Sequence, residues 1–188
     1  MVCESTLKSV SPVSKMIGRS GCSLRIWKAS SRPLISGMPT LGRVAVIKER
    51  CDARPLYVNT WGDAICAVFE NVETAGLFAL ALQNILLETD WETTDLKRDI
   101  SIRIGLHAGP VYKCFDPLLG HDTYNGAHVN RAARIEPVAE EGQIFASDAF
   151  AALAAIAKPD EFLCDYAGTR KLPKGAGMIS TFLVRPTH

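Results

Sequence analysis

The residues of this sequence best suited to chemistry are a polar pair in its second half, Asn130 and Arg134. They lie four positions apart, and Val129 and Ala132 repeat beside them at helical spacing. A helix here places the amide and the guanidinium on one face, just behind Gly126. Because a guanidinium offers a planar set of donors that matches phosphate oxygens, this face is suited to a phosphate group. A solvated helix face is the alternative interpretation of the same spacing.

A hairpin is predicted directly before this helix. Residues 101–106 alternate apolar and polar side chains, which is typical of a strand with one buried face. Gly109-Pro110 follows, and because proline fixes its own φ while glycine tolerates positive φ, this dipeptide favours a sharp reversal. Residues 111–112 are then expected to begin the return strand.

The helix that carries the polar pair is expected to end at about Glu136, because Pro137 follows it. After it, the patterns predict a strand, an alanine-rich helix with an N-cap and two closing strands: residues 143–146, residues 149–157 capped by Ser147-Asp148, and residues near 162–167 and 179–184.

A second hairpin is predicted in the first half of the chain. Residues 55–60 and 64–69 have the composition of strands, and Trp61-Gly62-Asp63 predicts the turn between them. Asp63 then lies at the tip, where an aspartate most often serves the turn itself. Asn71 is expected to cap the next helix, whose apolar stripe we interpret as core.

Composition predicts one compact domain and excludes several classes of partner. The chain has 188 residues, is 47% hydrophobic and 22% charged, and carries a net charge of +1, so no basic surface for nucleic acid or an anionic membrane is expected. The six cysteines have no C-x-x-C spacing, and we expect reduced thiols. No apolar run reaches the ~20 residues that span a bilayer, and no secretion signal is apparent, so the cytoplasm is the expected location.

Three blocks of the sequence, in order, resemble the catalytic domain of the class III nucleotidyl cyclases, the adenylate and guanylate cyclases. They are VNTWGDAICAVFENVETAGLFALALQ at residues 58–83, IRIGLHAGPVY and YNGAHVNRAARIE at residues 102–112 and 124–136, and YAGTRKLPKG at residues 166–175. The resemblance covers about residues 55–186, which we expect to form the cyclase domain. Residues 1–54 are expected to form an atypical, weakly patterned N-terminal segment.

The resemblance implies an α+β fold, the ferredoxin-like βαββαβ palm of the class III cyclases. Such domains pair head to tail, so a homodimer with active sites at its interface is expected. The implied reaction converts a nucleoside triphosphate into a 3′,5′-cyclic nucleotide and pyrophosphate, a lyase reaction of intracellular signalling, by attack of the ribose 3′-hydroxyl on the α-phosphate. ATP is the expected substrate.

The family's functional residues map onto several positions of this chain. Arg134 is expected to stabilise charge on the α-phosphate, Asn130 to orient the ribose and Lys174 to bind the triphosphate. Asp63 is expected to bind Mg²⁺ or Mn²⁺, because hard cations prefer carboxylate oxygens. His107 matches a position where the family has no catalytic histidine, so we expect no general base there.

The residues expected to select the base differ from the usual adenine pair of the family. Adenylate cyclases typically use a lysine and an aspartate or threonine, and the matching positions here are Asn59 and Thr123. Thr123 is compatible with adenine. Asn59 has an amide that offers both a donor and an acceptor, so it could face several bases.

The first strand of the family carries another metal-binding aspartate, in a pattern like F-x-D-[IV]-x-G-[FY]-[ST], which residues 1–54 do not match. We therefore expect the first strand to be missing or degenerate, through truncation or a frame shift. One alternative is a catalytically impaired pseudo-cyclase that acts as a dimerising or nucleotide-binding module. A second alternative, a ferredoxin-like nucleic-acid-binding domain, lacks the aromatic strand pattern of an RNA platform.

Overall fold

The structure, a computed structural model, describes residues 18–27, 53–61, 64–88 and 102–188. Its elements follow the chain in this order: β1 (Gly18–Trp27), β2 (Tyr57–Trp61), β3 (Ala64–Phe69), α2 (Val72–Leu87), β4 (Arg103–Asp116), β5 (His121–Asn125), α3 (Ala127–Ile135), the 3₁₀ turn η1 (Glu136–Val138), β6 (Ile144–Ser147), α4 (Asp148–Ala157), β7 (Phe162–Lys171) and β8 (Met178–Pro186).

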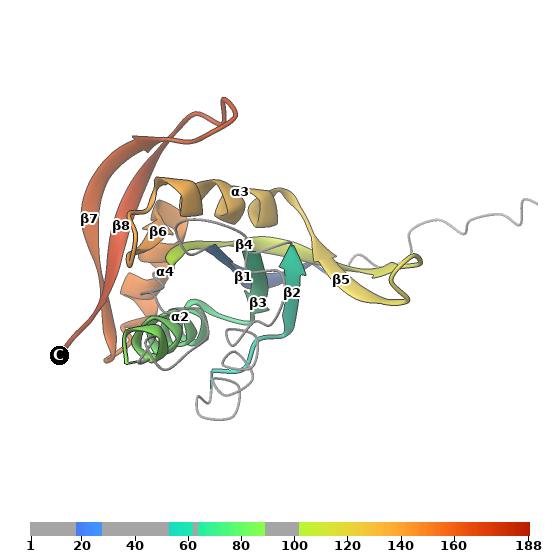
Figure 1. Ribbon diagram of the computed structural model, residues 1–188, viewed down its shortest axis with the longest axis horizontal. Coiled ribbons are helices and arrows are strands. Elements are labelled where there is room, and N and C mark those ends of the chain that lie inside the picture. Colours follow the sequence, from blue (N-terminus) through green and yellow to red (C-terminus); the bar gives the residue numbers. More distant parts are fainter. Residues whose placement is uncertain (1–17, 28–52, 62–63, 89–101) are drawn as a thin grey trace, which may run out of the picture.

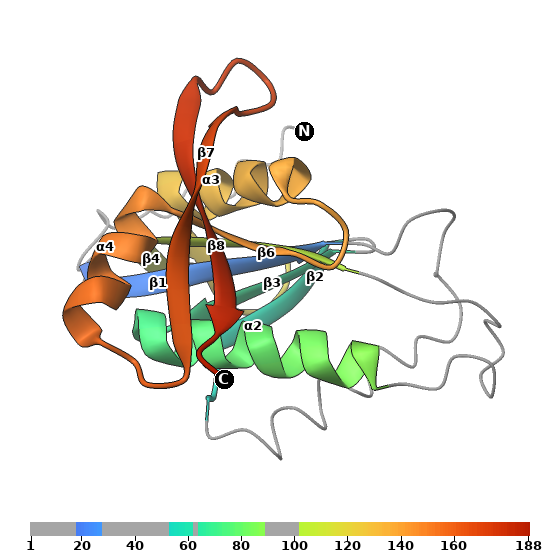
Figure 2. The ribbon, with the colours of Figure 1, turned by 90° about the vertical axis from the view of Figure 1, so that its left-hand side faces the viewer.

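The strands form one mixed sheet with helices on both faces (Figures 1 and 2). Its order is β2-β3-β1-β4-β6-β8-β7, with β5 pairing the far end of β4. β4 and β6 are parallel, and the other recorded pairs are antiparallel. In the part of the chain that the structure describes, no helix is long and apolar enough to cross a membrane.

Alternation along the strands divides the core between the two faces of the sheet. Ile104 and Leu106 of β4 pack with α2 and α4 in the larger apolar cluster. On the other face, Val111 packs with Val129 of α3, and Phe145 of β6 packs with Ile135 at the end of α3. The sheet is therefore covered by α2 and α4 on one face and by α3 on the other, which confirms the expected α+β fold.

Several local predictions are confirmed. Asn71 caps α2, where its side chain accepts a hydrogen bond from the Thr74 N–H at 2.9 Å. Ser147 caps α4 in the same way, by accepting from the Phe150 N–H at 3.1 Å. The first hairpin is β2 paired with β3, with Trp61 opposite Ala64.

The reversal predicted at Gly109-Pro110 is wrong. β4 continues through both residues to Asp116, and the hairpin closes instead between Asp116 and His121 of β5. Pro110 fits in the strand because β4 pairs with β6 only at 104–106 and with β5 only from 112 onward, which leaves one edge unpaired in these registers. Gly109 is required for space: a Cβ there would lie 2.1 Å from Nδ1 of His128.

The first strand of the palm is present but degenerate. β1 lies between β3 and β4 at the centre of the sheet, within the segment expected to be atypical. Its sequence, GRSGCSLRIW, contains no aspartate or glutamate. The weak apolar pattern of these residues explains why the strand is not evident from sequence, since its place is set by pairing with two neighbours.

Helix α3 lies unusually close to β4, because two glycines of that strand face it. A Cβ at Gly105 would lie 2.6 Å from the backbone N of Glu136 and 3.0 Å from the carbonyl O of Ala132. Gly109 leaves the equivalent space beneath His128. The backbone of β4 therefore forms the surface on which the helix carrying Asn130 and Arg134 lies.

This close approach predicts that Gly105→Ala destabilises the protein by about 1–3 kcal/mol, because the added methyl group meets backbone atoms that cannot rotate away. Urea unfolding measures the effect. Gly109→Ala should also destabilise, but Gly109→Ala combined with His128→Ala should recover part of that loss, since the clash is with a side chain. A Gly105→Ala variant as stable as the wild type would contradict this account of the helix position.

Candidate functional site

The structure brings three of the predicted site residues to one pocket. Asn130 and Arg134 lie one turn apart on α3, Asn130 exposed and Arg134 half-buried. Together with Lys174, from the loop between β7 and β8, they line a pocket of about 420 Å³. Residues that are 40 positions apart in the chain thus converge as the resemblance implies.

Lys174 is held by a tight loop between β7 and β8. Leu172 is buried, and its N–H donates to the carbonyl O of Gly177 at 2.9 Å, which closes the loop at its base. Lys174 itself has a φ of 57°, the left-handed region that side chains other than glycine seldom adopt. The loop conformation therefore fixes the start of the lysine side chain beside α3.

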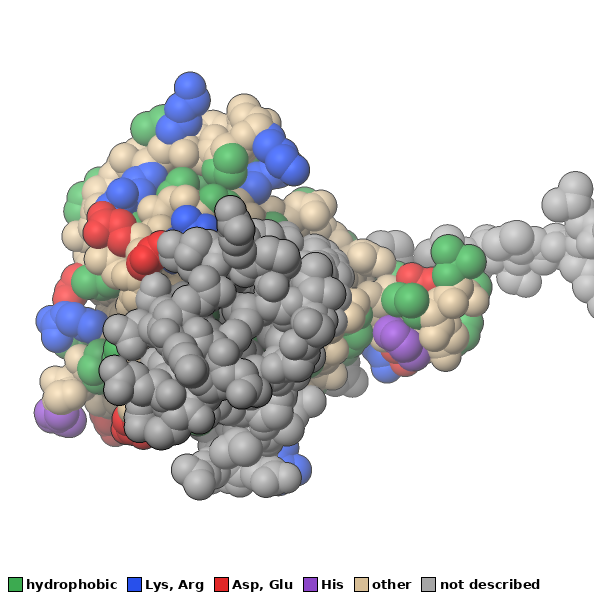
Figure 3. Space-filling model, viewed as in Figure 1, with side chains coloured by type: hydrophobic (Ala, Val, Ile, Leu, Met, Phe, Trp, Pro, Cys, Tyr) green, Lys and Arg blue, Asp and Glu red, His purple; other side chains and the backbone are tan. Residues whose placement is uncertain are grey.

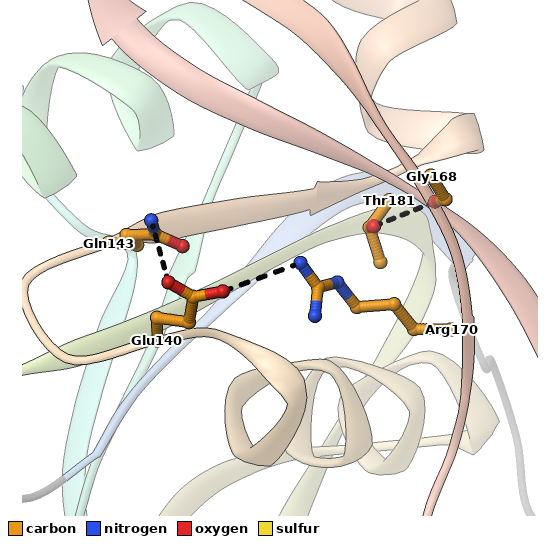
Figure 4. Close-up of polar contacts among 5 residues, drawn as sticks. All are labelled: Glu140, Gln143, Gly168, Arg170 and Thr181. Atoms are coloured by element: carbon orange, nitrogen blue, oxygen red, sulfur yellow. Dashed lines mark hydrogen bonds and ion pairs between the residues drawn. The ribbon is translucent and has the colours of Figure 1, made fainter.

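Polar contacts attach the β7–β8 arm to the body of the domain (Figure 4). Arg170 lies 3.7 Å from the carboxylate of Glu140, and its guanidinium lies 4.8 Å from the centre of the Phe145 ring. Within the arm itself, where β7 bulges, Thr181 of β8 donates its hydroxyl hydrogen to the carbonyl O of Gly168 at 2.9 Å. The exposed ion pair contributes little energy by itself. The pairing of β8 with β6, the stacking of Arg170 on Phe145 and the buried Leu172 attach the arm.

An ion pair with a buried carboxylate lines the same pocket as Arg134. Nε of Arg103, on β4, lies 3.1 Å from Oε1 of Glu136, whose residue is only 2% exposed. Glu136 begins η1, directly after α3. The pair therefore connects the C-terminal end of the helix to the strand beneath it.

The charges around the pocket suit an anion. Arg103, Arg134 and Lys174 bring three positive charges, and the one carboxylate among the lining residues, that of Glu136, is already paired with Arg103. Figure 3 shows lysine and arginine side chains in blue over the region of the β7–β8 arm. Such a concave site attracts polyanions such as phosphate chains.

The two residues expected to select the base lie away from this pocket, on strands β2 and β5. Asn59 is opposite Cys66 of β3, and Thr123 is opposite Cys114 of β4. Tyr57 connects the two strands: its hydroxyl lies 3.1 Å from Oγ1 of Thr123, and its ring centre lies 5.5 Å from that of Tyr124. Thr123 is therefore held in position by a neighbour that the sequence did not indicate.

The predicted metal ligand, Asp63, lies outside the described residues. Within the described ranges, no group of three or more histidine, cysteine, aspartate or glutamate side chains could hold a metal ion. The residues of β1 that lie opposite the start of β3 are Arg25 and Ile26. Neither of these two residues carries a carboxylate. The described residues therefore do not fit a site for a pair of metal ions.

Sequence reasoning missed Arg103, Glu136 and Tyr57. Arg103 and Glu136 lie inside the blocks that carry the resemblance, but an arginine on an alternating strand predicts only a solvated face. Their pairing depends on tertiary structure, because 33 positions separate them. Tyr57 falls in the predicted first hairpin without any local sign of a distant partner.

The domain has an α+β fold built on one mixed sheet, and a cationic pocket lies between helix α3 and the β7–β8 loop. Such a domain is suited to a phosphorylated ligand. The sequence profile of the adenylate and guanylate cyclase catalytic domain matches residues 45–186. The chain therefore belongs to the adenylate and guanylate cyclase catalytic domain family.

Curated relatives are much longer than this chain. An adenylate cyclase of Mycosarcoma maydis is 38% identical over an alignment of 107 residues, which covers 48% of this chain and 4% of that protein. An adenylate cyclase of Neurospora crassa is 35% identical over an alignment of 109 residues, which covers 50% of this chain and 5% of that protein. The matches thus span about a twentieth of the length of these relatives.

Solved cyclase domains share the fold. The guanylate cyclase domain of RhGC from Catenaria anguillulae, in complex with GTP, superposes with a TM-score of 0.72 at 23% identity, over 89% of this chain and 97% of that one. An adenylate cyclase from Trypanosoma brucei gives a TM-score of 0.73 at 19% identity, over 88% of each chain. The likeness confirms the class III cyclase palm.

The buried ion pair makes a testable contribution to stability. Replacing Arg103 by Met removes the cationic partner of the buried Glu136 carboxylate, and we expect a loss of about 3 kcal/mol in the free energy of unfolding. Adding Glu136→Gln to the same protein should recover more than half of that loss, because the amide carries no charge. Denaturant unfolding of the single and double variants measures both the loss and the recovery of the free energy of unfolding. Equal stability of wild type and Arg103→Met would show that the pair is not formed.

Proposed function

We propose that this chain is a nucleotide cyclase domain that converts a nucleoside triphosphate, ATP in the first instance, into a 3′,5′-cyclic nucleotide and pyrophosphate. One observation carries the proposal: Asn130, Arg134 and Lys174 line a single cationic pocket beside α3. A triphosphate carries its charge along a chain, and a lysine and an arginine from two different elements of the pocket can bind two parts of it.

The proposed mechanism depends on positioning and charge stabilisation. Lys174 binds the outer phosphates, and Asn130 holds the ribose so that its 3′-oxygen faces the α-phosphate in line with the leaving pyrophosphate. Arg134 donates hydrogen bonds to the α-phosphate oxygens as negative charge grows on them. The 3′-oxygen–phosphorus bond forms, the bond to the bridging oxygen breaks, and the 3′-hydroxyl proton leaves to solvent.

A divalent ion, Mg²⁺ or Mn²⁺, is part of the proposal, with Asp63 as its protein ligand. Such an ion would supply Lewis-acid stabilisation of the phosphates. Because β1 offers no second carboxylate, no step of the mechanism above is assigned to the ion.

Recognition of the base is proposed for Asn59 and Thr123. Thr123 is fixed by Tyr57 and presents an oxygen that can accept or donate a hydrogen bond. Among solved cyclases of this fold, one holds GTP, and a core with converted specificity holds ATPαS, so the fold accommodates either purine. The choice of ATP for this chain therefore depends on Thr123 and is open to direct test.

A homodimer is proposed as the active form, and its location as the cytoplasm. Three large apolar side chains are exposed near the tip of the β4–β5 arm: Phe115 is 62% exposed, Leu118 94% and Leu119 55%. Figure 3 shows hydrophobic side chains in green at the end of the protruding arm. A second copy of the chain would cover such a patch.

A second candidate function is a catalytically impaired cyclase that binds nucleotide or dimerises without turnover. The absence of any carboxylate from β1 favours it. The two proposals differ in one observable, because the impaired form binds nucleotide in the same pocket but releases no pyrophosphate.

The first experiment incubates the purified chain with ATP, GTP, CTP or UTP and Mn²⁺ and measures cyclic product and pyrophosphate. We expect cyclic AMP as the main product, at a rate that Asp63→Ala abolishes. Product no greater than that of the Asp63→Ala control would sink the enzymatic proposal, and binding of ATP under the same conditions would then support the impaired cyclase.

A second experiment tests the role of the helix. Arg134→Ala should lower kcat by ~10³-fold or more while the free energy of unfolding stays within about 1 kcal/mol of the wild type, because the guanidinium acts on the transition state. Arg134→Lys should restore little, since a lysine lacks the planar fork. Arg185→Ala is the matched control, because Arg185 pairs with Asp165 on the β7–β8 ribbon and does not line the pocket. Equal losses in both variants would remove Arg134 from the mechanism.

A third experiment tests the shared active site. Asp63→Ala and Arg134→Ala chains are each expected to be inactive, whereas their mixture should recover up to about a quarter of the wild-type rate, because each mixed dimer then contains one intact site. Replacing both Leu118 and Leu119 by Ser should convert dimer to monomer in analytical ultracentrifugation. A mixture as inactive as its components would show that the site lies within one chain.

A further inference from the structure

Three polar side chains, two of them buried, form a hydrogen-bonded row between β4, α4 and the N-terminal end of α3. His107 of β4 lies between the other two: its Nδ1 is 2.7 Å from Oγ of Ser147, and its Nε2 is 2.9 Å from Nδ1 of His128. The two imidazole rings are within 17° of parallel. His107 is 3% exposed and Ser147 is fully buried. The row thus joins β4, the N-terminus of α4 and α3.

The hydrogens in this row have one consistent order. Oγ of Ser147 accepts the Phe150 N–H at the start of α4, so its own hydrogen is available for Nδ1 of His107. A neutral His107 then carries its single hydrogen on Nε2 and donates it to Nδ1 of His128. Each group donates in the same direction, from the cap of α4 towards α3, and no buried donor or acceptor of the central ring is left without a partner.

The surroundings keep the central ring neutral. Burial, together with the nearby charges of His128 and Arg131 on α3, lowers the pKa of His107 to about 4, while Asp148 at the start of α4 acts in the opposite direction. A protonated ring would place a hydrogen on Nδ1 facing the Ser147 hydroxyl, so the serine hydrogen would lose its acceptor. The hydrogen-bond geometry and the nearby charges therefore both favour a neutral His107 ring.

The row acts on the helix that carries the proposed catalytic pair. His128 lies two residues before Asn130 and rests directly above Gly109, where no Cβ can fit. At the other end of α3, Glu136 is tied to Arg103. The helix is thus attached to β4 at both ends, by an ion pair at the C-terminal end and by the row of hydrogen bonds at the N-terminal end.

We propose that His107 and His128 are positioning residues, and that the directional row from Ser147 through His107 to His128 sets the depth and rotation of α3 at which Asn130 and Arg134 meet the nucleotide. This role rests on the proposed function for its catalytic consequence. The geometry of the row itself does not.

The first test observes the row directly. Long-range ¹H–¹⁵N NMR of imidazole nitrogens should show His107 as the neutral form with hydrogen on Nε2, unchanged between pH 5.5 and 8. Unfolding measured between pH 7 and pH 4 adds a second readout. Unfolded His107 takes up a proton near pH 6.5 and the folded ring only near pH 4, so stability falls across this window, and it should fall less in His107→Gln. A His107 that titrates between pH 5.5 and 8 would overturn the proposal.

The second test measures the effect on the helix and on turnover. His107→Phe keeps a ring but removes both hydrogen bonds, whereas His107→Gln retains one acceptor and one donor. We expect kcat to fall ~10- to 100-fold in His107→Phe, with KM for the nucleotide changed less than about threefold, because a displacement of about 1 Å costs that much in rate. His107→Gln should recover most of the rate, and His188→Phe, at the exposed C-terminus, should behave as wild type.

Amide hydrogen exchange separates the failure of this proposal from the failure of the proposed function. In His107→Phe, the α3 amides should exchange at least ~10-fold faster than in the wild type, whether or not the chain makes cyclic nucleotide. A folded His107→Phe with unchanged α3 exchange would overturn the positioning role. In a chain without any turnover, altered α3 exchange would support the positioning role while the cyclase proposal fails.

Discussion

The seating of α3 on two glycines of β4 is the constraint on which the rest of the site depends. A helix normally lies on a layer of side chains, but Gly105 and Gly109 offer no side chain beneath Ala132, Glu136 and His128. The helix therefore lies close to the strand backbone, and the sheet fixes the positions of the residues on the outer side of the helix. Asn130 and Arg134 are therefore presented by a rigid element, which suits a reaction that depends on positioning.

The second half of the pocket is attached independently. Lys174 belongs to the β7–β8 loop, whose base is held by Leu172 in the same apolar cluster as Ile135, the last residue of α3. That shared cluster links the two walls of the pocket, with Arg170 stacked on Phe145 as a second link. A substitution in this cluster would change the distance between Lys174 and Arg134 without altering either residue. Apolar packing therefore controls the spacing of the two charges.

The sequence predicts most helices and strands because their apolar periods and caps are local properties, as Asn71 and Ser147 show. It fails where a residue serves the tertiary structure. Gly109 and Pro110 together have the residue types of a turn, but Gly109 lies in a strand and provides space for His128. The sequence of β1 lacks a strand pattern, and its position comes from pairing with β3 and β4. In the site, the resemblance predicts that Asn130, Arg134 and Lys174 meet, whereas the Arg103–Glu136 pair and the Tyr57–Thr123 contact join residues far apart in sequence. The metal half stays a prediction, because Asp63 lies outside the described residues.

The central claim is that α3 and the β7–β8 loop together form a receptor for a phosphate chain. Calorimetric titration with inorganic tripolyphosphate tests it most directly, since this ligand has neither base nor ribose. The account predicts binding that weakens with added salt, falls at least tenfold in both Lys174→Ala and Arg134→Ala, and is unchanged in Asn59→Ala. Tripolyphosphate affinity that is the same in all four proteins would contradict it.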